Sequence, residues 1–310
     1  MKKKKKLWIL LLTTVILCSC SSGNDGATDT PDTPTPPTAE ERLSIHIGTA
    51  VNDREDTRVT DLAFEAGDQI GLYVANRNSD GTPATLKPTG NHVDNMRFTY
   101  DGTWTPDTPI YWADNKTNAD LYIYYPYTTT VTDVKAMPFN VSADQSSEAA
   151  YKAGDVIIGS KKNVSPTEST VIIDARHAMS QMLIELAPGN GFTAESLAEA
   201  DINVRINGIK TNSTIDLAAG TVAATGEPTA ITPMKSGDGY KALIVPQSVA
   251  DGNLLTVTAD GREYNLKKGM TFESGKRYRV TVTLSKTSDG VNVTIDQWED
   301  DGTDYGGTAE

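Results

Sequence analysis

The sequence contains very little cysteine. Only two of its 310 residues are cysteines, Cys18 and Cys20, and both follow an apolar run near the N-terminus. The rest of the chain can therefore form no disulfide, no cysteine metal site and no cysteine nucleophile. Its stability must come from apolar burial and hydrogen-bonded backbone, and the length is sufficient for two domains of ordinary size.

Positive charge is also scarce. The sequence has 28 Lys and Arg against 41 Asp and Glu, which gives a formal net charge of −13. Loss of the five lysines Lys2–Lys6 would make the charge still more negative. Such a surface repels the phosphates of nucleic acids and anionic lipid head groups. We therefore expect no nucleic-acid partner.

The sequence also lacks the motifs that usually carry chemistry. It contains no phosphate-binding loop, dinucleotide fingerprint, paired-histidine metal motif or Gly-x-Ser-x-Gly elbow. The three histidines, His46, His92 and His177, are scattered, and His177 precedes an apolar strand as a packed or hydrogen-bonded residue would. Asp300–Asp304 resembles half a calcium loop without the distal Glu. We predict no catalysis, no cofactor and no metal, with glycosidase carboxylates left open.

The N-terminus has the pattern of an export signal. Lys2–Lys6 precede the apolar run Leu7–Leu17, which is followed by Cys18-Ser19-Cys20. A basic start, an apolar core and small residues at the exit predict a secretory signal peptide, and the run is shorter than the roughly 20 residues of a membrane span. The exit resembles a bacterial lipobox. We expect residues 1–19 to be removed and Cys20 to carry a lipid; the alternative is an ordinary signal peptide cleaved nearby.

The segment after Cys20 is a predicted tether. Residues 20–41 are rich in Pro, Thr, Asp and Gly and show no apolar periodicity. Such a composition favours an extended, semi-rigid spacer without a fold of its own. It would hold the following domains away from a membrane.

Many short strands separated by turn signals follow the tether. Asp101-Gly102 and Asp260-Gly261 are typical hairpin turns. Only residues 193–200 favour a short helix. This pattern predicts an all-β fold made of β-sandwiches. A polar stretch at residues 165–169 places the boundary between domains of residues 42–168 and 169–298, followed by a flexible tail of residues 299–310.

The first and last of the predicted strands both alternate apolar and polar residues. The first places Leu43, Ile45 and Ile47 on one face and His46 on the other. The last, residues 291–295, has the same alternation. The polar segment of residues 52–58 follows the first strand and is predicted to be an exposed loop.

Several groups of residues between positions 43 and 298 form an ordered set of motifs. They are Phe64, Gly67, Asp68, Ile70-Gly71-Leu72-Tyr73, Trp104, Ile110-Tyr111-Trp112, Tyr122, Tyr124-Tyr125-Pro126-Tyr127, His177–Met182, Phe272–Tyr278 and Trp298. Each motif alone is only modestly specific, but their order together with the lipobox is specific. In this order they resemble the Mfa-like fimbrillin family of the Bacteroidales.

This resemblance implies a pilus subunit made of two tandem transthyretin-like β-sandwich domains. Members of the family are exported as lipoproteins to the outer membrane and polymerise into cell-surface fimbriae. A trypsin-like or Arg-specific protease removes the first strand, and a strand from the C-terminal region of another subunit takes its place. The resemblance implies no cofactor, and it leaves open whether the subunit belongs to the shaft or to the tip.

The resemblance gives the loop arginines a hypothetical role. We predict processing after Arg54 or Arg58, with Arg42 a weaker candidate because cleavage there leaves the strand attached; the alternative is that they are solvated surface arginines. The displaced strand would carry Leu43, Ile45 and Ile47. The predicted donor side chains are Val291, Val293 and Ile295.

Two other classes of protein remain open from the sequence. The first is a monomeric surface lipoprotein that binds a glycan or a host protein, with Trp104, Trp112 and Trp298 as candidate sugar platforms, although core packing explains these residues better. The second is a secreted hydrolase, for which no constellation of residues is evident.

Overall fold

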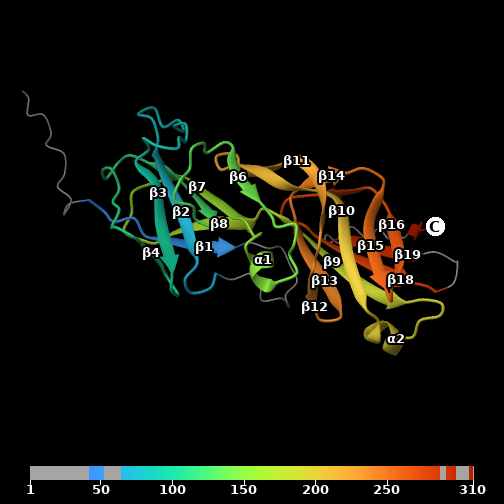
Figure 1. Cartoon of the computed structure of the whole chain (residues 1–310). Helices are drawn as coiled ribbons and strands as arrows, with labels where there is room; N and C mark the ends of the chain where they lie inside the picture. The colour runs from blue at the N-terminus through green and yellow to red at the C-terminus, as the bar shows by residue number, and fades with distance from the viewer. Residues whose placement is uncertain (1–41, 52–63, 287–290, 298–306, 310) are drawn as a thin grey trace, which may run out of the picture. The chain divides into compact units, whose positions relative to one another are not determined.

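The computed structural model describes residues 42–51, 64–286, 291–297 and 307–309 (Figure 1). In this part of the chain twenty strands are accompanied by two short helices, α1 (Glu148–Lys152) and α2 (Ala194–Glu199). The prediction of an all-β fold is therefore confirmed. No helix among the described residues is long and apolar enough to cross a membrane. The predicted signal peptide, Cys20 and the tether lie outside the described residues.

The strands of the first half form a seven-stranded sheet. β1 is at one edge of this sheet and β4 at the other. β1 and β8 run parallel, whereas the remaining neighbours are antiparallel. In spatial order the strands are β1 (Ile47–Val51), β8 (Val171–His177), β7 (Ile157–Val164), β5 (Ala119–Tyr125), β2 (Gln69–Asn76), β3 (Val93–Tyr100) and β4 (Trp104–Pro106).

The central strands of this sheet are buried on both faces. In β2, Leu72 and Val74 join one apolar cluster, while Tyr73 and Ala75 join the other. This explains why β2 and β5 read as continuous apolar runs rather than as alternating sequences. The first cluster contains Ile45, Ile47, Trp104 and Trp112, and we call it the slot cluster.

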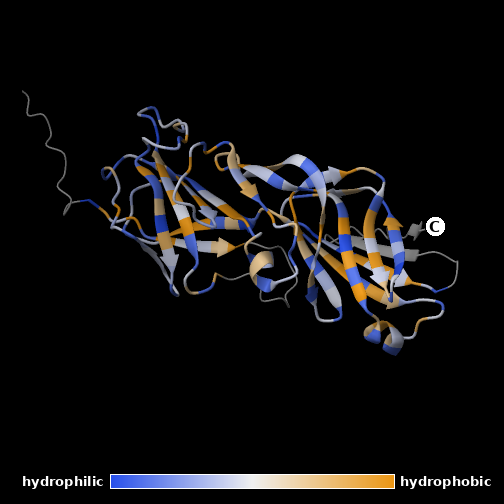
Figure 2. Cartoon of the chain, in the orientation of Figure 1, coloured by the Kyte–Doolittle hydropathy of each residue, from blue (hydrophilic) through white to orange (hydrophobic). Residues whose placement is uncertain are grey.

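Two further sheets share the second apolar cluster. Hydrophobic and hydrophilic residues alternate along strands such as β10 (Figure 2), and the inward residues of β9, β10, β15 and β18 belong to one core. The five-stranded sheet has the order β11 (Thr221–Ile231), β10 (Ile202–Asp216), β15 (Asn253–Ala259), β16 (Arg262–Lys267), with β6 (Met137–Asn140) also paired to β10. The six-stranded sheet has the order β12 (Met234–Ser236), β13 (Gly239–Ile244), β9 (Ser180–Pro188), β18 (Arg277–Leu284), β19 (Val291–Gln297), β20 (Gly307–Ala309), and β14 (Gln247–Val249) pairs with β17 (Met270–Phe272).

Strand pairing crosses the boundary predicted near residue 168. β8 follows this position but pairs with β7 and β1 of the first half. Conversely, β6 precedes it but pairs with β10 of the second half. The division into residues 42–168 and 169–298 remains a prediction. Each half contributes one strand, β6 or β8, to a sheet of the other half.

A buried glutamine fixes another link between distant segments. The side chain of Gln145 donates to the carbonyl of Leu243 (2.8 Å) and accepts from its N–H (2.8 Å). The amide therefore acts as a strand partner for one residue of β13. Buried backbone groups need such partners because an unpaired one costs about 1–3 kcal/mol.

Buried tyrosines make the fold less stable at strongly alkaline pH. Burial raises the pKa of Tyr124 and of Tyr125 to about 12, and it shifts the pKa of Tyr122 and Tyr278 in the same direction. The ordinary value in an unfolded chain is about 10. Because the folded pKa is the higher one, the stabilising contribution is complete below about pH 10 and is lost as the pH rises through the folded values.

We therefore expect the free energy of unfolding to be constant from neutral pH to about pH 9 and to fall between about pH 10 and 12. Urea denaturation at a series of pH values measures this fall. Ultraviolet titration of tyrosinate in the folded protein is the control. Ionisation of all tyrosines near the ordinary pKa of about 10 would contradict the prediction.

Candidate functional site

The first-strand segment, which we define as residues 43–51, has two different sets of backbone partners. The N–H of Ile45 donates to the carbonyl of Ile110 (2.9 Å), and the N–H of Trp112 donates to the carbonyl of Leu43 (2.9 Å). From Ile47 onward the segment runs along β8 as β1, in a register that pairs Ile47 with Val171. The predicted strand, residues 43–47, thus covers only the first part of the segment, and the regular strand β1 extends to residue 51.

The side chains of this segment complete the slot cluster. Ile45 and Ile47 are 3% and 5% exposed, Leu43 packs against the same cluster, and His46 is exposed, in agreement with the alternation of the sequence. Burial of each isoleucine side chain contributes about 1.5–3 kcal/mol. Withdrawal of the segment would expose apolar walls such as Trp112 together with unpaired backbone groups of β8. A vacated slot of this kind can bind another strand.

Two residues of β1 make close contacts with neighbouring side chains on opposite faces of the strand. The indole N–H of Trp104 donates to the hydroxyl of Thr49 (3.1 Å). On the other face, Gly48 lies opposite Ile172, and a Cβ at position 48 would be 2.7 Å from Ile172 Cδ1. Ile172 is 48% exposed, so its side chain lies over the glycine rather than in the core.

The predicted processing residues flank the first-strand segment. Arg42 immediately precedes it, and its Nε is buried without a hydrogen-bond partner. Arg54 and Arg58 lie outside the described residues, in the connection between β1 and Phe64. Cleavage in that connection would separate the segment from the rest of the chain, whereas cleavage after Arg42 would not.

The predicted donor segment is held inside a sheet. β19, which contains Val291, Val293 and Ile295, lies between β18 and β20. Its six paired positions with β18 extend from Asn292 to Gln297. The final strand, β20, was not predicted from the sequence; it pairs with β19 at three positions and forms the edge of this sheet.

Two of the three histidines make polar contacts within the fold. His92 Nε2 is 2.6 Å from the carbonyl oxygen of Tyr111, and His177 Nδ1 is 2.8 Å from Asp155 Oδ1. Trp104 and Trp112 are buried, whereas Trp298 and the acidic residues 300–304 lie outside the described residues. Among the described residues, no group of three or more His, Cys, Asp or Glu side chains could hold a metal ion.

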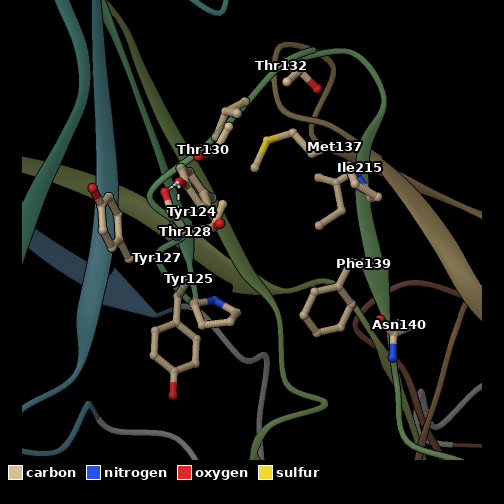
Figure 3. Close-up of a pocket in the computed structure, with 13 residues that line it drawn as sticks. Tyr124, Tyr125, Tyr127, Thr128, Thr130, Thr132, Met137, Phe139, Asn140 and Ile215 are labelled. Carbon is tan, nitrogen blue, oxygen red and sulfur yellow. Dashed lines mark hydrogen bonds between the residues drawn. The ribbon is translucent and has the colours of Figure 1, made fainter.

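A hollow of about 280 Å³ lies at the end of β5 (Figure 3). Phe139, Met137 and Ile215 face the ring of a tyrosine across it, and several threonines surround its rim. No charged side chain lines it. The sequence analysis did not identify this hollow, although four of its thirteen lining residues come from the aromatic run Tyr124–Tyr127. The lining residues are Tyr124, Tyr125, Pro126, Tyr127, Thr128, Thr130, Val131, Thr132, Met137, Pro138, Phe139, Asn140 and Ile215.

The described part of the chain is an all-β protein in which the edge strand β1 completes an apolar cluster. Residues 57–298 match the fimbrillin-like family, and the chain belongs to this family. The resemblance found in the sequence is thereby confirmed.

Known relatives agree with this membership. A protein of Bacteroides uniformis named as the fimbrium subunit Fim1C is 27% identical over 308 residues, which cover 96% of this chain and 95% of that protein. The fold is similar to two crystal structures described as cell adhesion proteins. One is from B. uniformis (TM-score 0.62, 21% identity, 83% of this chain and 99% of that one), and the other is from B. ovatus (TM-score 0.64, 16% identity, 83% and 97%).

Proposed function

We propose that this chain is a non-catalytic structural subunit of a cell-surface fimbria and joins other subunits by strand exchange. The observation that carries the proposal is the edge position of β1, with Ile45 and Ile47 buried in the slot cluster. The family and a relative named as a fimbrium subunit support the same role.

The proposed assembly proceeds in three steps. The chain is exported, cleaved before Cys20 and anchored by a lipid in the outer membrane, with residues 20–41 as its tether. A trypsin-like or Arg-specific protease then cuts after Arg54 or Arg58, which detaches the first-strand segment. The slot in the first of two tandem transthyretin-like sandwiches accepts a strand from another fimbrillin subunit, which restores apolar contacts and backbone hydrogen bonds together.

Limited proteolysis tests this proposal. An Arg-specific protease should cut the purified chain so that a new N-terminus appears at Glu55 or Val59. The cut protein should then form oligomer ladders that resist mild denaturant, because release of each subunit would require the slot to be emptied. N-terminal sequencing and gel electrophoresis measure both results.

The double variant Arg54→Gln/Arg58→Gln should stay uncut at this connection and monomeric. Arg205→Gln, at an exposed position of β10, is the matched control and should behave as the wild type. An intact connection between β1 and β2, a product that starts at Leu43, or a cut protein that stays monomeric would each overturn the proposal.

The uncharged hollow beside β5 favours a second candidate, a monomeric surface lipoprotein that binds a neutral glycan. Aromatic rings such as Tyr127 and Phe139 with hydroxyl and amide groups nearby are the surroundings that sugars prefer. A cut chain that remains monomeric yet binds a neutral oligosaccharide would favour this second function. Strand exchange has the stronger support because the family is fimbrillin-like.

A further inference from the structure

The long strand β11 has an unpaired edge. Among the described residues it pairs only with β10, and it forms one rim of the five-stranded sheet (Figure 1). Within this part of the chain its backbone is therefore hydrogen-bonded on one side only. Edge strands usually carry charged residues, prolines or bulges, which prevent another strand from pairing with them.

The two halves of β11 differ in this protection. The second half contains Glu227, Pro228 and a register shift, at which Gly226 has a φ of 75°. The first half, Thr221–Thr225, pairs with β10 without a shift and contains no charged residue and no proline. Another strand can therefore pair with the first half, whereas the second half resists it.

The hydrogen bonds of β10 show which backbone groups face this edge. The carbonyl of Thr211 and the N–H of Leu217 bond to the residues that flank β6 (3.0 and 2.8 Å), on the side away from β11. Because bonding alternates along an antiparallel strand, the even-numbered residues between them bond to the odd-numbered residues of β11. The N–H and C=O groups of Val222 and Ala224 therefore point to the unpaired edge.

The sequence of the first half is nearly symmetrical about Ala223. Residues 220–226 are Gly-Thr-Val-Ala-Ala-Thr-Gly, so threonine and then glycine follow at equal distances in both directions. A two-fold interface requires a surface that complements itself, and threonine opposite threonine is a favourable cross-strand pair. The side chains of Thr221, Ala223 and Thr225 are small and exposed, so two such strands can approach without a clash.

The low charge of this region favours a second copy as the partner. The chain has a net charge of −13, and 22% of its residues are charged, so two copies repel each other over much of their surface. Between Leu217 and Met234 the sequence contains a single charged residue, Glu227. If two copies pair symmetrically about Ala223, Glu227 lies opposite Ala219 and faces no like charge.

We propose that residues 220–226 of two copies of this chain pair as antiparallel strands about a two-fold axis at Ala223. In this register Val222 lies opposite Ala224 of the second copy, and Thr221 lies opposite Thr225 of the second copy. Val222 and Ala224 then exchange N–H···O bonds, which gives about four backbone hydrogen bonds across the axis. The two five-stranded sheets become one continuous sheet.

A contact of this size is weak between two single chains, because a stable interface buries about 1,200–2,000 Å². The uncut chain therefore stays monomeric in dilute solution. In a fibre the same edge recurs in every subunit, and many weak contacts together would join fibres side by side. This consequence rests on the proposed strand exchange, but the pairing itself does not.

Disulfide trapping in the uncut full chain tests the pairing. Non-hydrogen-bonded partners in antiparallel strands have Cα atoms about 4.5 Å apart, within the roughly 4.4–6.8 Å that a disulfide spans. Mild oxidation of concentrated Ala223→Cys protein should therefore give a dimer joined at position 223, identified by mass spectrometry of its peptides. Ala230→Cys, at an exposed position in the protected half of β11, is the matched control. It should give no more dimer than the wild type, in which Cys18 and Cys20 set the background.

Two further experiments test the register and the hydrogen bonds. Thr221→Cys and Thr225→Cys chains should cross-link when they are mixed, whereas neither should cross-link alone. Ala224→Pro removes an N–H that faces the edge and leaves the bonds to β10 intact, so it should abolish the dimer of Ala223→Cys. Circular dichroism checks that this variant is folded.

Three results would overturn the inference. The first is an Ala223→Cys dimer no more abundant than that of Ala230→Cys. The second is a mixture of Thr221→Cys and Thr225→Cys that cross-links no better than either chain alone. The third is a disulfide from the introduced cysteine to Cys18 or Cys20, which would identify another segment as the occupant of the edge. Each result concerns the uncut chain, so strand exchange would stand.

Discussion

Replacement of Asp120 with alanine should lower the free energy of unfolding by about 3–5 kcal/mol. Asp120 is 2% exposed on β5, and its Oδ1 accepts from Arg77 Nε (2.8 Å) and from the N–H of Asn163 (2.7 Å). Removal of the carboxylate leaves the guanidinium of Arg77 largely buried without its partner. Urea denaturation followed by circular dichroism measures the loss.

An exposed ion pair provides the control for this prediction. Arg97 Nη2 lies 2.9 Å from Asp107 Oδ2, but the two side chains are 39% and 43% exposed. Asp107→Ala should therefore cost no more than about 1 kcal/mol. The loss of stability for Asp120→Asn should lie between the losses for Asp120→Ala and Asp107→Ala, because an amide oxygen can still accept one of the hydrogen bonds. Equal losses for Asp120→Ala and Asp107→Ala would contradict the role assigned to burial.

The second large effect is expected at Trp112. Its side chain is 1% exposed, and its indole N–H donates to the carbonyl of Thr167 (2.9 Å). Its backbone N–H donates to the carbonyl of Leu43. Trp112→Ala should lower the free energy of unfolding by about 3–5 kcal/mol, because it leaves a cavity in the slot cluster and an unpaired carbonyl. Thermal and urea denaturation both report this loss.

The comparison variant for Trp112 lies on the same sheet. Ile172→Ala removes an exposed side chain on the outer face of β8 and should change the stability by no more than about 0.5 kcal/mol. Trp112→Phe should cost less than Trp112→Ala because the ring still fills most of the space. A Trp112→Ala protein as stable as the Ile172→Ala protein would show that this tryptophan does not support the slot.

Local features of the fold were predictable because their signals lie within a few residues. Asp260 and Gly261 have positive φ values of 49° and 80° and join β15 to β16, as their sequence predicts. Thr193 caps α2 through a capping box with Ser196, where the only helix was expected. The short helix α1 was missed because its five residues give too little periodicity to detect.

The segment predicted to be the donor, residues 291–295, shows the limit of such reasoning. The alternation of residues 291–295 indicated a strand, and β19 (Val291–Gln297) is a strand at this position. The sequence did not indicate that β19 lies between two partners, or that the polar Gly-rich tail contributes an edge strand of its own. An alternation of apolar and polar residues identifies a strand and its two faces, but the strands that pair with it can come from any part of the chain.

The sequence by itself determined the all-β class, the inward faces of the first-strand segment, the hairpin turns and the fimbrillin-like family. The tertiary structure decided the pairing of β1 with β8, of β6 with β10 and of Gln145 with Leu243. These contacts join residues far apart in the chain, where loop closure adds only a small, slowly varying cost that favours no particular partner. The choice among partners depends on which apolar faces and backbone groups remain unsatisfied once the local hairpins have formed.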